Sequence, residues 1–439
     1  MATASHIDLT NDASGFFRGR PVLPESAKMA SQLLQKNHDD FHIFFNREGF
    51  HNHIAHHLLA IYALGATEKE IQRAYDVNVD YQRPQYPLQD DIVHELGDTR
   101  NFMQYLGDEK YYHDYQTFFQ RAMHAKGWQA VINEYLFAKD DRAESLLVRM
   151  FAGFLHPLIH LGYGVEFQQP AIIAEALAQA AVHSDWIGKL LRPAEERASQ
   201  KSEDKTLFEL LEKIRTNDEI VNAPHWEDGN KIRDGLLARA GEEVINLASQ
   251  WRVKPENLEK KMAEMINASV YFTCAAQHPP KQIKFDFYFM HCVNCSIFFS
   301  SFLQQPWLNA SHMTRLLEWK GRLDLAMYAS RKSPGLLVSE ITEYTPKRPS
   351  SDGWKAIFDR VDRHEDDGHA AKFIRALAHG QQICAKYEVQ ESWPIQGDMW
   401  LKLGHMVIDS VEDDGAHWVR SAGFPEAWES FHDRKRPME

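Results

Sequence analysis

Cysteine is scarce in this chain, with four among 439 residues. A disulfide framework needs more, so we expect free thiols and a reducing compartment, the cytoplasm. Cys292 and Cys295 have a CxxC spacing, but they lie in an apolar, helix-like run with no second CxxC to close a zinc site. Buried thiols are therefore the favoured interpretation, and a redox or metal role for this pair is the weaker one.

Long apolar runs and an excess of positive charge are also missing. No run approaches the roughly 18 apolar residues of a membrane-spanning helix, and the N-terminus has neither the basic nor the apolar region of a secretory signal. The formal net charge is −13, which disfavours binding to a phosphate backbone. We therefore expect a soluble globular protein with no nucleic-acid or membrane partner, and the sequence leaves its oligomeric state open.

Strand-like alternation is rare, whereas helical periodicity dominates the chain. The sequence predicts an all-α fold: a single large multi-helix domain over residues 1–439, with a metal site buried between helices and few or no strands. The best strand candidate is 337–344. Thr67 and Glu70 form a capping box at the start of one helix. The polar stretch 193–205 is expected to be a surface loop or lid.

One predicted helix carries residues that matter below. Residues 141–161 repeat apolar side chains at helical period, and Pro157 should bend this helix, because its ring removes a hydrogen bond and clashes with the preceding turn. Further helices are expected at 171–191, 206–216, 231–251, 256–277, 283–304, 312–328, 354–361, 370–389 and 399–411.

Histidine, by contrast, is abundant, with 23 residues, and many lie in apolar helical stretches. The densest cluster spans 50–59, a second spans 155–161, and His291 lies alone in the apolar run 285–292. An imidazole in apolar surroundings must find a partner or lose its charge. Several neutral imidazoles that converge would suit iron, copper, nickel or zinc.

The spacing of these histidines favours a shared metal. His156 and His160 are four residues apart, which places both rings on one helix face. His53 and His57 repeat this spacing, and Asn52 suits the N-terminal cap of their helix. The glutamate of the HExxH motif is missing after His156, which disfavours peptide hydrolysis. The competing interpretation is a non-catalytic helical scaffold in which these histidines are hydrogen-bonded core residues.

Charge balance calls for an anionic ligand. A divalent cation held only by neutral imidazoles would keep its full charge in a low-dielectric core. Glu166 and Asp286 are near the clusters in sequence, but Glu166 falls close to a helix end. A buried lysine with a lowered pKa can take up carbon dioxide as a carbamate, an oxygen anion, and Lys372 is the candidate. The alternative is an ordinary ion pair from Lys372 to Asp366 or Asp367.

Four stretches of the chain carry a distinctive combination of motifs. They read FHNH at 50–53 followed by HLLAIYALGA at 57–66, LHPLIHLGYGVEF at 155–167, FYFMH at 287–291, and DDGHAAK at 366–372 with RAL at 375–377. Together they resemble the questin oxidase-like family, which is common in biosynthetic gene clusters of filamentous fungi. The resemblance covers about residues 40–415. The CxxC after His291 departs from the family pattern and leaves the substrate open.

The resemblance implies oxidative cleavage of a ring of an aromatic polyketide, typically an anthraquinone, in secondary metabolism. The implied centre is a non-haem iron(II) with dioxygen as co-substrate, held by His53, His156, His160, His291 and a carbamate on Lys372, with His57 or His369 as general base. A flat substrate pocket would be lined by Phe50, Tyr163, Phe167, Phe287 and Tyr288.

Alternatives to this reaction stay open. One is an NADPH-dependent Baeyer–Villiger monooxygenase that acts on the same substrate class. The other is a zinc hydrolase or hydratase with the metal in the same histidine cage. No GxGxxG follows a strand-like run, so no flavin fingerprint is present, and this favours a metal over a flavin as the oxygen activator.

Overall fold

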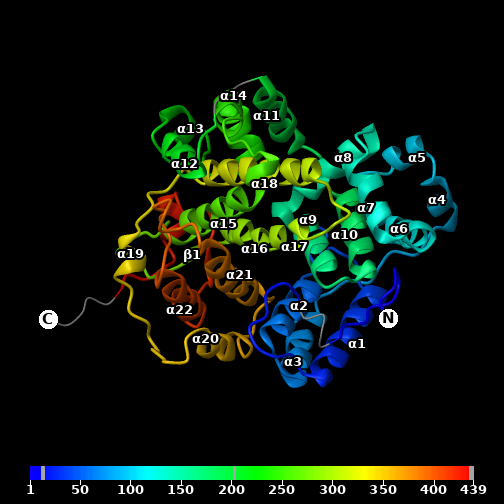
Figure 1. Ribbon diagram of the computed structural model, residues 1–439, viewed down its shortest axis with the longest axis horizontal. Coiled ribbons are helices and arrows are strands. Elements are labelled where there is room, and N and C mark those ends of the chain that lie inside the picture. The colour runs from blue at the N-terminus through cyan, green and yellow to red at the C-terminus, as the bar shows by residue number, and fades with distance from the viewer. Residues whose placement is uncertain (11–14, 201–203, 435–439) are drawn as a thin grey trace. The chain divides into compact units, whose positions relative to one another are not determined.

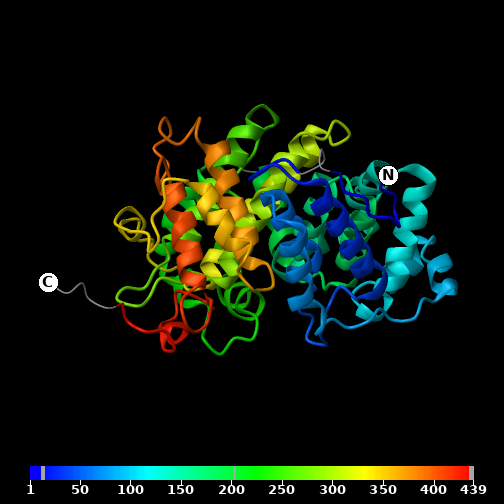
Figure 2. The same ribbon diagram turned by 90° about the horizontal axis from the view of Figure 1, so that it is seen from below.

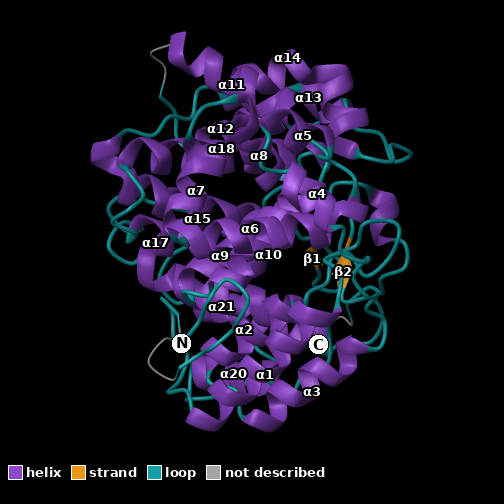
Figure 3. Ribbon diagram, turned by 90° about the vertical axis from the view of Figure 1, so that its right-hand side faces the viewer, coloured by secondary structure: helices purple, strands orange, loops and turns teal. Residues whose placement is uncertain are grey.

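Helices make up nearly all of the regular structure (Figure 3). The computed structural model describes residues 1–10, 15–200 and 204–434. Within these ranges the only strands are the two-residue β1 (Phe285–Asp286) and β2 (Trp418–Val419), which pair in parallel with Phe285 opposite Trp418. The prediction of an all-α fold with few strands is confirmed.

Two compact units divide the chain. The first contains Met1–Ile187, Phe298–Asn309 and Val361–Arg375, and the second contains Gly188–Ile297, Ala310–Arg360 and Ala376–Glu439. Each unit is therefore assembled from three stretches that are far apart in sequence. The prediction of one domain over residues 1–439 stays a prediction.

The first unit is built around two helices that are almost completely buried, α9 and α10, and these pack against each other. Helix α10 also packs against α6, and α9 packs against α2 and α17. Helices α1, α2 and α3, blue in Figure 1, lie side by side. The elements of this unit are α1 (Pro24–Asp40), α2 (Ile54–Leu64), α3 (Glu68–Val79), α4 (Asp90–Glu95), α5 (Thr99–Gln104), η1 (Glu109–Tyr111), α6 (Tyr112–Lys126), α7 (Trp128–Phe137), α8 (Asp141–Met150), α9 (Ala152–Glu166), α10 (Pro170–Val182), α17 (Phe298–Leu303) and the start of α21 (His369–Cys384).

The second unit packs its helices around α15 and α18, which contact each other and α16. Its stretches are coloured from green through yellow to red in Figure 2. All four cysteines of the chain lie in it, buried and free, as the sequence predicted. Its elements are α11 (Gly188–Gln200), α12 (Leu207–Arg215), α13 (Asp218–Asn222), η2 (Lys231–Leu236), α14 (Leu237–Ala248), η3 (Pro255–Asn257), α15 (Leu258–Cys274), β1, α16 (Phe287–Ser296), α18 (Ala310–Ser330), α19 (Ser339–Thr342), α20 (Trp354–Val361), the rest of α21, α22 (Met399–Val411), β2 and η4 (Pro425–Trp428).

One predicted helix cap is confirmed and one is wrong, because the N-cap of α2 is His53 and not Asn52. The capping box of Thr67 and Glu70 is present at the start of α3. The strand predicted at 337–344 is wrong, because that stretch contains the short helix α19. The loop predicted at 193–205 is also wrong up to residue 200, which belongs to α11, and 201–203 lie outside the described residues. Helix α11 buries a narrow apolar face beneath a highly charged one, which hid its helical pattern.

The chain turns sharply between α8 and α9. The two helices are bent by 96°, and Gly153, Phe154 and Leu155 have left-handed φ angles of 52°, 55° and 71°. The prediction of one helix over 141–161, bent at Pro157, is therefore wrong. Pro157 lies just after the left-handed residues, in the first turn of a new right-handed segment, where its missing N–H costs no helical hydrogen bond.

No single described helix is long and apolar enough to cross a membrane. The bent pair of α8 and α9 passes that test when its two helices are taken together, on length and composition alone.

Candidate metal centre

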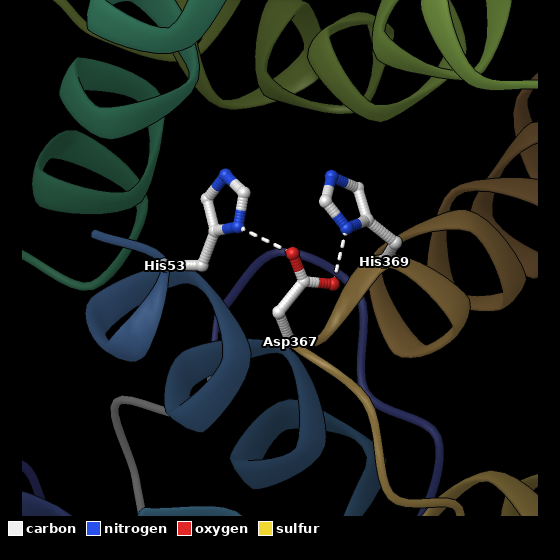
Figure 4. A group of neighbouring side chains, drawn as sticks. All are labelled: His53, Asp367 and His369. Atoms are coloured by element: carbon white, nitrogen blue, oxygen red, sulfur yellow. Dashed lines mark hydrogen bonds and ion pairs between the residues drawn. The ribbon is translucent and has the colours of Figure 1, made fainter. Parts of the chain in front are cut away.

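Asp367 binds two histidines at once (Figure 4). Its Oδ2 accepts a hydrogen bond from His53 Nδ1 at 3.0 Å, and its Oδ1 accepts one from His369 Nδ1. His53 caps the start of α2, and His369 is the first residue of α21. Figure 4 shows both rings on the same side of the carboxylate, with each Nε2 pointing away from it. One possible ligand atom from each residue lies within 4.8 Å of the others, so the trio is a candidate metal site.

The loop before α21 holds this carboxylate in place. Asp366 Oδ1 accepts from Gly368 N at 2.7 Å and its Oδ2 accepts from Ala370 N at 2.9 Å, which closes the first turn of α21. Gly368 has a φ of +86°, and a Cβ there would lie 2.5 Å from His57 Cβ. Only glycine therefore lets this loop come so close to α2.

The two groups joined by this contact have strongly altered acidities. Burial acts to raise the pKa of Asp367, but the charges of His369 and His53 and their hydrogen bonds outweigh it and hold the pKa well below its usual range. Burial, and then the ammonium of Lys372, lowers the pKa of His53 to about 3. An ionised carboxylate thus faces a neutral imidazole whose Nδ1–H it accepts. This leaves Nε2 of His53 as the lone-pair nitrogen, the usual arrangement behind a metal-bound histidine.

His156 supplies a nitrogen that faces His53. The left-handed turn at 153–155 brings the Gly153 carbonyl within 2.5 Å of His156 Nδ1, so Nδ1 donates and Nε2 carries the lone pair. His156 Nε2 then lies 2.8 Å from His53 Nε2. Two lone pairs at this distance repel each other unless a cation lies against both. The pair therefore has the chemistry of a two-imidazole cation site.

Two more histidines pack behind His156. The ring of His51 stacks on that of His156, with centroids 3.7 Å apart and planes 7° apart, and its Nε2 lies 2.9 Å from His183 Nε2. A Cβ on Gly153 would lie 2.6 Å from His183 Cε1 and 3.0 Å from His51 Cε1. The absence of a side chain at Gly153 thus lets both rings close on the turn that positions His156.

Glu175, on α10, binds a second pair of histidines. Its Oε2 accepts from His160 Nε2 at 2.6 Å, and its Oε1 accepts from His38 Nδ1 at 2.5 Å. Burial acts to raise the pKa of Glu175, but the hydrogen bonds from His160 and His38 lower it to about 2. His160 Nδ1 lies 3.0 Å from His56 Nε2. Both ring nitrogens of His160 therefore have protein partners, and its role as a metal ligand stays a prediction.

Lys372 lies on α21, three residues after His369, and its residue is 4% exposed. Burial lowers its pKa to about 8, against the opposing charges of Asp367 and Asp366. Among the described residues, neither Asp366 nor Asp367 forms an ion pair with it, and Asp367 is engaged by His53 and His369 instead. The amine therefore lies buried near the site without the simple ion pair that the sequence allowed.

The other predicted site residues of the first unit are buried beside this cluster or engaged elsewhere. His57 is buried beneath the Gly368 loop, burial lowers its pKa, and Asn78 Nδ2 lies 3.5 Å from its Nδ1. Glu166 ends α9 and pairs with Arg375, whose Nη1 lies 3.1 Å from its Oε2. Of the predicted aromatic lining, Tyr163 and Phe167 are buried, whereas Phe50 is exposed.

His291 belongs to the second unit, where it is buried on α16. Its Nδ1 lies 2.6 Å from the Phe287 carbonyl, so Nδ1 donates and Nε2 is again the lone-pair nitrogen. Asp286 accepts from Tyr288 N and Phe289 N and so caps the start of α16. His291 thus has the anchoring seen at His156, and its role as a ligand stays a prediction.

Several members of these clusters were missed from the sequence, among them Asp367 as a bridge, Glu175 and His56. Glu175 had a readable signal, because it is the only charged residue in the apolar helix α10 and so requires a buried partner. His56 was not among the predicted site residues. Asp367 had been considered only as a partner for Lys372, and its two histidine contacts involve a residue 314 positions away.

Comparison with known proteins places these motifs in a family. Residues 50–377 match the family model described as questin oxidase-like. The chain is 42% identical over 435 residues to Baeyer-Villiger oxidase ptaJ of Pestalotiopsis fici, which covers 97% of this chain and 98% of that one. It is 37% identical over 436 residues to questin oxidase of Aspergillus terreus, with 98% of each chain covered. Oxidoreductase AflY of Aspergillus parasiticus is 40% identical over 428 residues, 96% of this chain and 86% of that one.

Proposed function

The chain belongs to the questin oxidase-like family and is an oxidoreductase, and on that premise we propose that it is a non-haem iron oxygenase. Its substrate is an anthraquinone-type aromatic polyketide, of which it cleaves one ring in secondary metabolism. The names of its relatives, Baeyer-Villiger oxidases and a questin oxidase, support oxygen insertion next to a ring carbonyl.

One observation carries the proposal of a metal. His53 Nε2 and His156 Nε2 face each other at 2.8 Å, while an oxygen accepts the hydrogen of each Nδ1. A proton between them is disfavoured, because the pKa of His53 is lowered to about 3. A metal cation removes the repulsion instead, and neutral imidazoles with a nearby anion suit iron(II).

His53, His156 and His369 would hold the iron through Nε2, with Asp367 behind two of them. Lys372 would supply the anionic ligand as a carbamate. Its nitrogen lone pair attacks the carbon of carbon dioxide and one amine proton is released, which leaves a singly charged carboxylate on nitrogen. A pKa of about 8 supports this step, because part of the amine is then uncharged near neutral pH. His160 and His291 stay predicted ligands.

Iron(II), when bound there, supplies the one-electron chemistry that dioxygen requires. The chain's own residues do the rest. Asp367 accepts the Nδ1 hydrogens of His53 and His369 and so keeps both rings in one tautomer. His57, neutral because burial lowers its pKa, is placed to accept the proton of a substrate phenol, which makes the ring electron-rich.

The names of the relatives favour a second candidate, an NADPH-dependent Baeyer–Villiger monooxygenase acting on the same substrate class. The two candidates differ in what they consume and in what they add to the product. A dioxygenase adds both atoms of one dioxygen, whereas a monooxygenase adds one atom and oxidises one NADPH.

Anaerobic reconstitution with iron(II), followed by dioxygen and a panel of anthraquinones, tests the proposal. We expect turnover without NADPH and a product that contains two atoms of labelled oxygen. His156→Ala should bind no iron, whereas the control His42→Gln should bind it normally, because His42 is equally buried but contacts the Phe44 and Glu109 carbonyls. Protein that holds one equivalent of zinc, with no activity restored by iron, would contradict the proposal.

A further inference from the structure

Glu175 is the only acceptor at the end of two hydrogen-bond chains. On one side, His56 Nε2 faces His160 Nδ1 at 3.0 Å, and His160 Nε2 faces Glu175 Oε2 at 2.6 Å. On the other, Gln120 Nε2 lies 2.9 Å from His38 Nε2, and His38 Nδ1 lies 2.5 Å from Glu175 Oε1. An ionised carboxylate can only accept, so His160 Nε2 and His38 Nδ1 must both donate to it.

The direction has a consequence for each ring. His160 must carry its hydrogen on Nε2, because that atom faces the carboxylate. In a neutral ring its Nδ1 is then an acceptor, and His56 donates to it from Nε2. One carboxylate thus sets the tautomers of two successive imidazoles without contacting the second of them.

His56 lies against the candidate metal site. Its ring centroid is 5.9 Å from that of His53 and 6.1 Å from that of His156, with the planes within 29° and 26° of parallel. Its other face packs on Tyr163 at 5.3 Å. Glu175 also anchors α9 directly, because His160 is one helical turn after His156 on that helix. The orientation of His156 therefore depends on Glu175 by two routes.

We propose that Glu175 is a positioning residue for the metal site. It holds His160 as the Nε2–H tautomer, and through His160 it fixes the ring of His56 and the rotation of α9, so that the Nε2 atoms of His53 and His156 stay aligned. The proposal rests on the proposed function only for its second consequence, the effect on iron. Its first consequence, the tautomers, is independent of any metal.

The chain contains a matched control on the same helix. Gln179 is one turn after Glu175 on α10, fully buried, and neither amide atom has a hydrogen-bond partner among the described residues. Gln179→Leu therefore changes a buried polar side chain on the same face of α10 without touching the histidine chains. Glu175→Gln keeps the size of the side chain but replaces one acceptor oxygen by a donor.

Metal-free protein labelled with 15N in its histidines gives the first test, by correlation of ring nitrogens with ring protons. We expect His160 and His56 as Nε2–H tautomers in the wild type and in Gln179→Leu, and a changed tautomer of His160 or of His38 in Glu175→Gln, which keeps only one acceptor oxygen. A wild-type His160 protonated on Nδ1, or tautomers that Glu175→Gln leaves unchanged, would overturn the proposal. A wild type that binds no iron would sink the proposed function, and this first measurement would still decide the role of Glu175.

Iron(II) titration and steady-state kinetics give the second test. Glu175→Gln should bind iron about tenfold more weakly and lose kcat in proportion, with the substrate KM unchanged. The visible absorption of the cobalt(II)-substituted protein should shift, because it reports ligand geometry. Gln179→Leu should match the wild type in all three. If Glu175→Gln lowers only the melting temperature, with wild-type iron affinity and cobalt spectrum in the folded protein, Glu175 is structural and the proposal fails.

Discussion

Asp367 and Glu175 do the same chemistry in two different settings. Each carboxylate accepts one hydrogen bond per oxygen from two imidazoles, and each has its pKa lowered by them. The Asp367 side chain is 38% exposed and comes from a loop, whereas that of Glu175 is 3% exposed and comes from the middle of α10. Under the proposed function, the carboxylate of Asp367 orients two nitrogens toward a metal, whereas that of Glu175 binds His160 and His38 in the protein interior. We therefore expect the same motif to serve metal binding at one end of the histidine cluster and rigidity at the other.

Replacing the carboxylate of Asp367 should have the largest effect on the metal. Asp367→Asn keeps the shape but offers only one acceptor, so either His53 or His369 loses its orienting partner. We expect iron affinity and kcat/KM to fall by about 100-fold with little change in the melting temperature. Metal titration and calorimetry measure both. Unchanged iron affinity would show that Asp367 orients nothing that binds the metal.

Variants of Lys372 test whether the proposed metal site beside Asp367 needs a further anionic ligand. Lys372→Met should lower iron affinity by at least about tenfold, since a cation then lacks a charge-balancing ligand. Lys372→Glu should recover part of it and should no longer respond to removal of bicarbonate. A carbamate signal from 13C-labelled bicarbonate should appear only in the wild type. Equal iron affinity in Lys372→Met and the wild type would remove the carbamate from the site.

The Gly153 carbonyl accepts the Nδ1 hydrogen of His156, whereas His53 and His160 donate to the carboxylates of Asp367 and Glu175. Gly153→Ala combines a left-handed φ with a Cβ 2.6 Å from His183, so we expect a loss of about 2–4 kcal/mol of stability and weaker iron binding. Gly49→Ala is the control, because Gly49 has a φ of +79° but nothing within 4 Å of a Cβ. Chemical denaturation of both variants separates the clash from the strain. Equal losses would mean that the rings behind His156 are not tightly packed.

The smallest predicted effect is the dependence of folding stability on pH in the acid range. The folded pKa of Glu175 is about 2, below its unfolded value near 4.5, so its contribution to stability is present above pH 4.5 and is lost as pH falls toward 2. The pKa of His42 is lowered from 6.5 to about 4, so stability is lost there as pH falls from 6.5 to 4. Each group contributes a slope of at most about 1.4 kcal/mol per pH unit. Glu175→Gln should reduce the loss of stability between pH 4.5 and 2, and His42→Gln should reduce the loss between pH 6.5 and 4. Denaturation at each pH measures both.

Local sequence patterns predicted most helices and some of the histidines of the site. Contacts between residues far apart in sequence could not be predicted from them. Thr67 and Glu70 announce a helix start because cap and partner are three residues apart. His53 and His156 could be predicted as site residues because they lie in apolar helical stretches. Their actual partners, Asp367 and the Gly153 carbonyl, depend on a loop far along the chain and on a left-handed turn. Neither has a periodic pattern to read.

The left-handed turn was missed for a specific reason. Pro157 was the conspicuous helix breaker, so the bend was assigned to it, whereas Gly153 is the residue at which the chain actually turns. A glycine in an apolar run can indicate either close helix packing or a left-handed backbone conformation. At Gly153 the distinction depends on the packing of His51 and His183 against it, which the sequence does not show.

The first unit takes its last stretch, Val361–Arg375, from far beyond its main body. On the ribosome, His53 and His156 emerge long before the residues that orient one of them and supply the charge. A nascent chain therefore exposes two imidazoles that have not yet met Asp367 or Lys372, and the proposed metal site cannot form until these later residues have been made. Under the proposed function, loading with iron would then be a late event, after the separate stretches of this unit have come together.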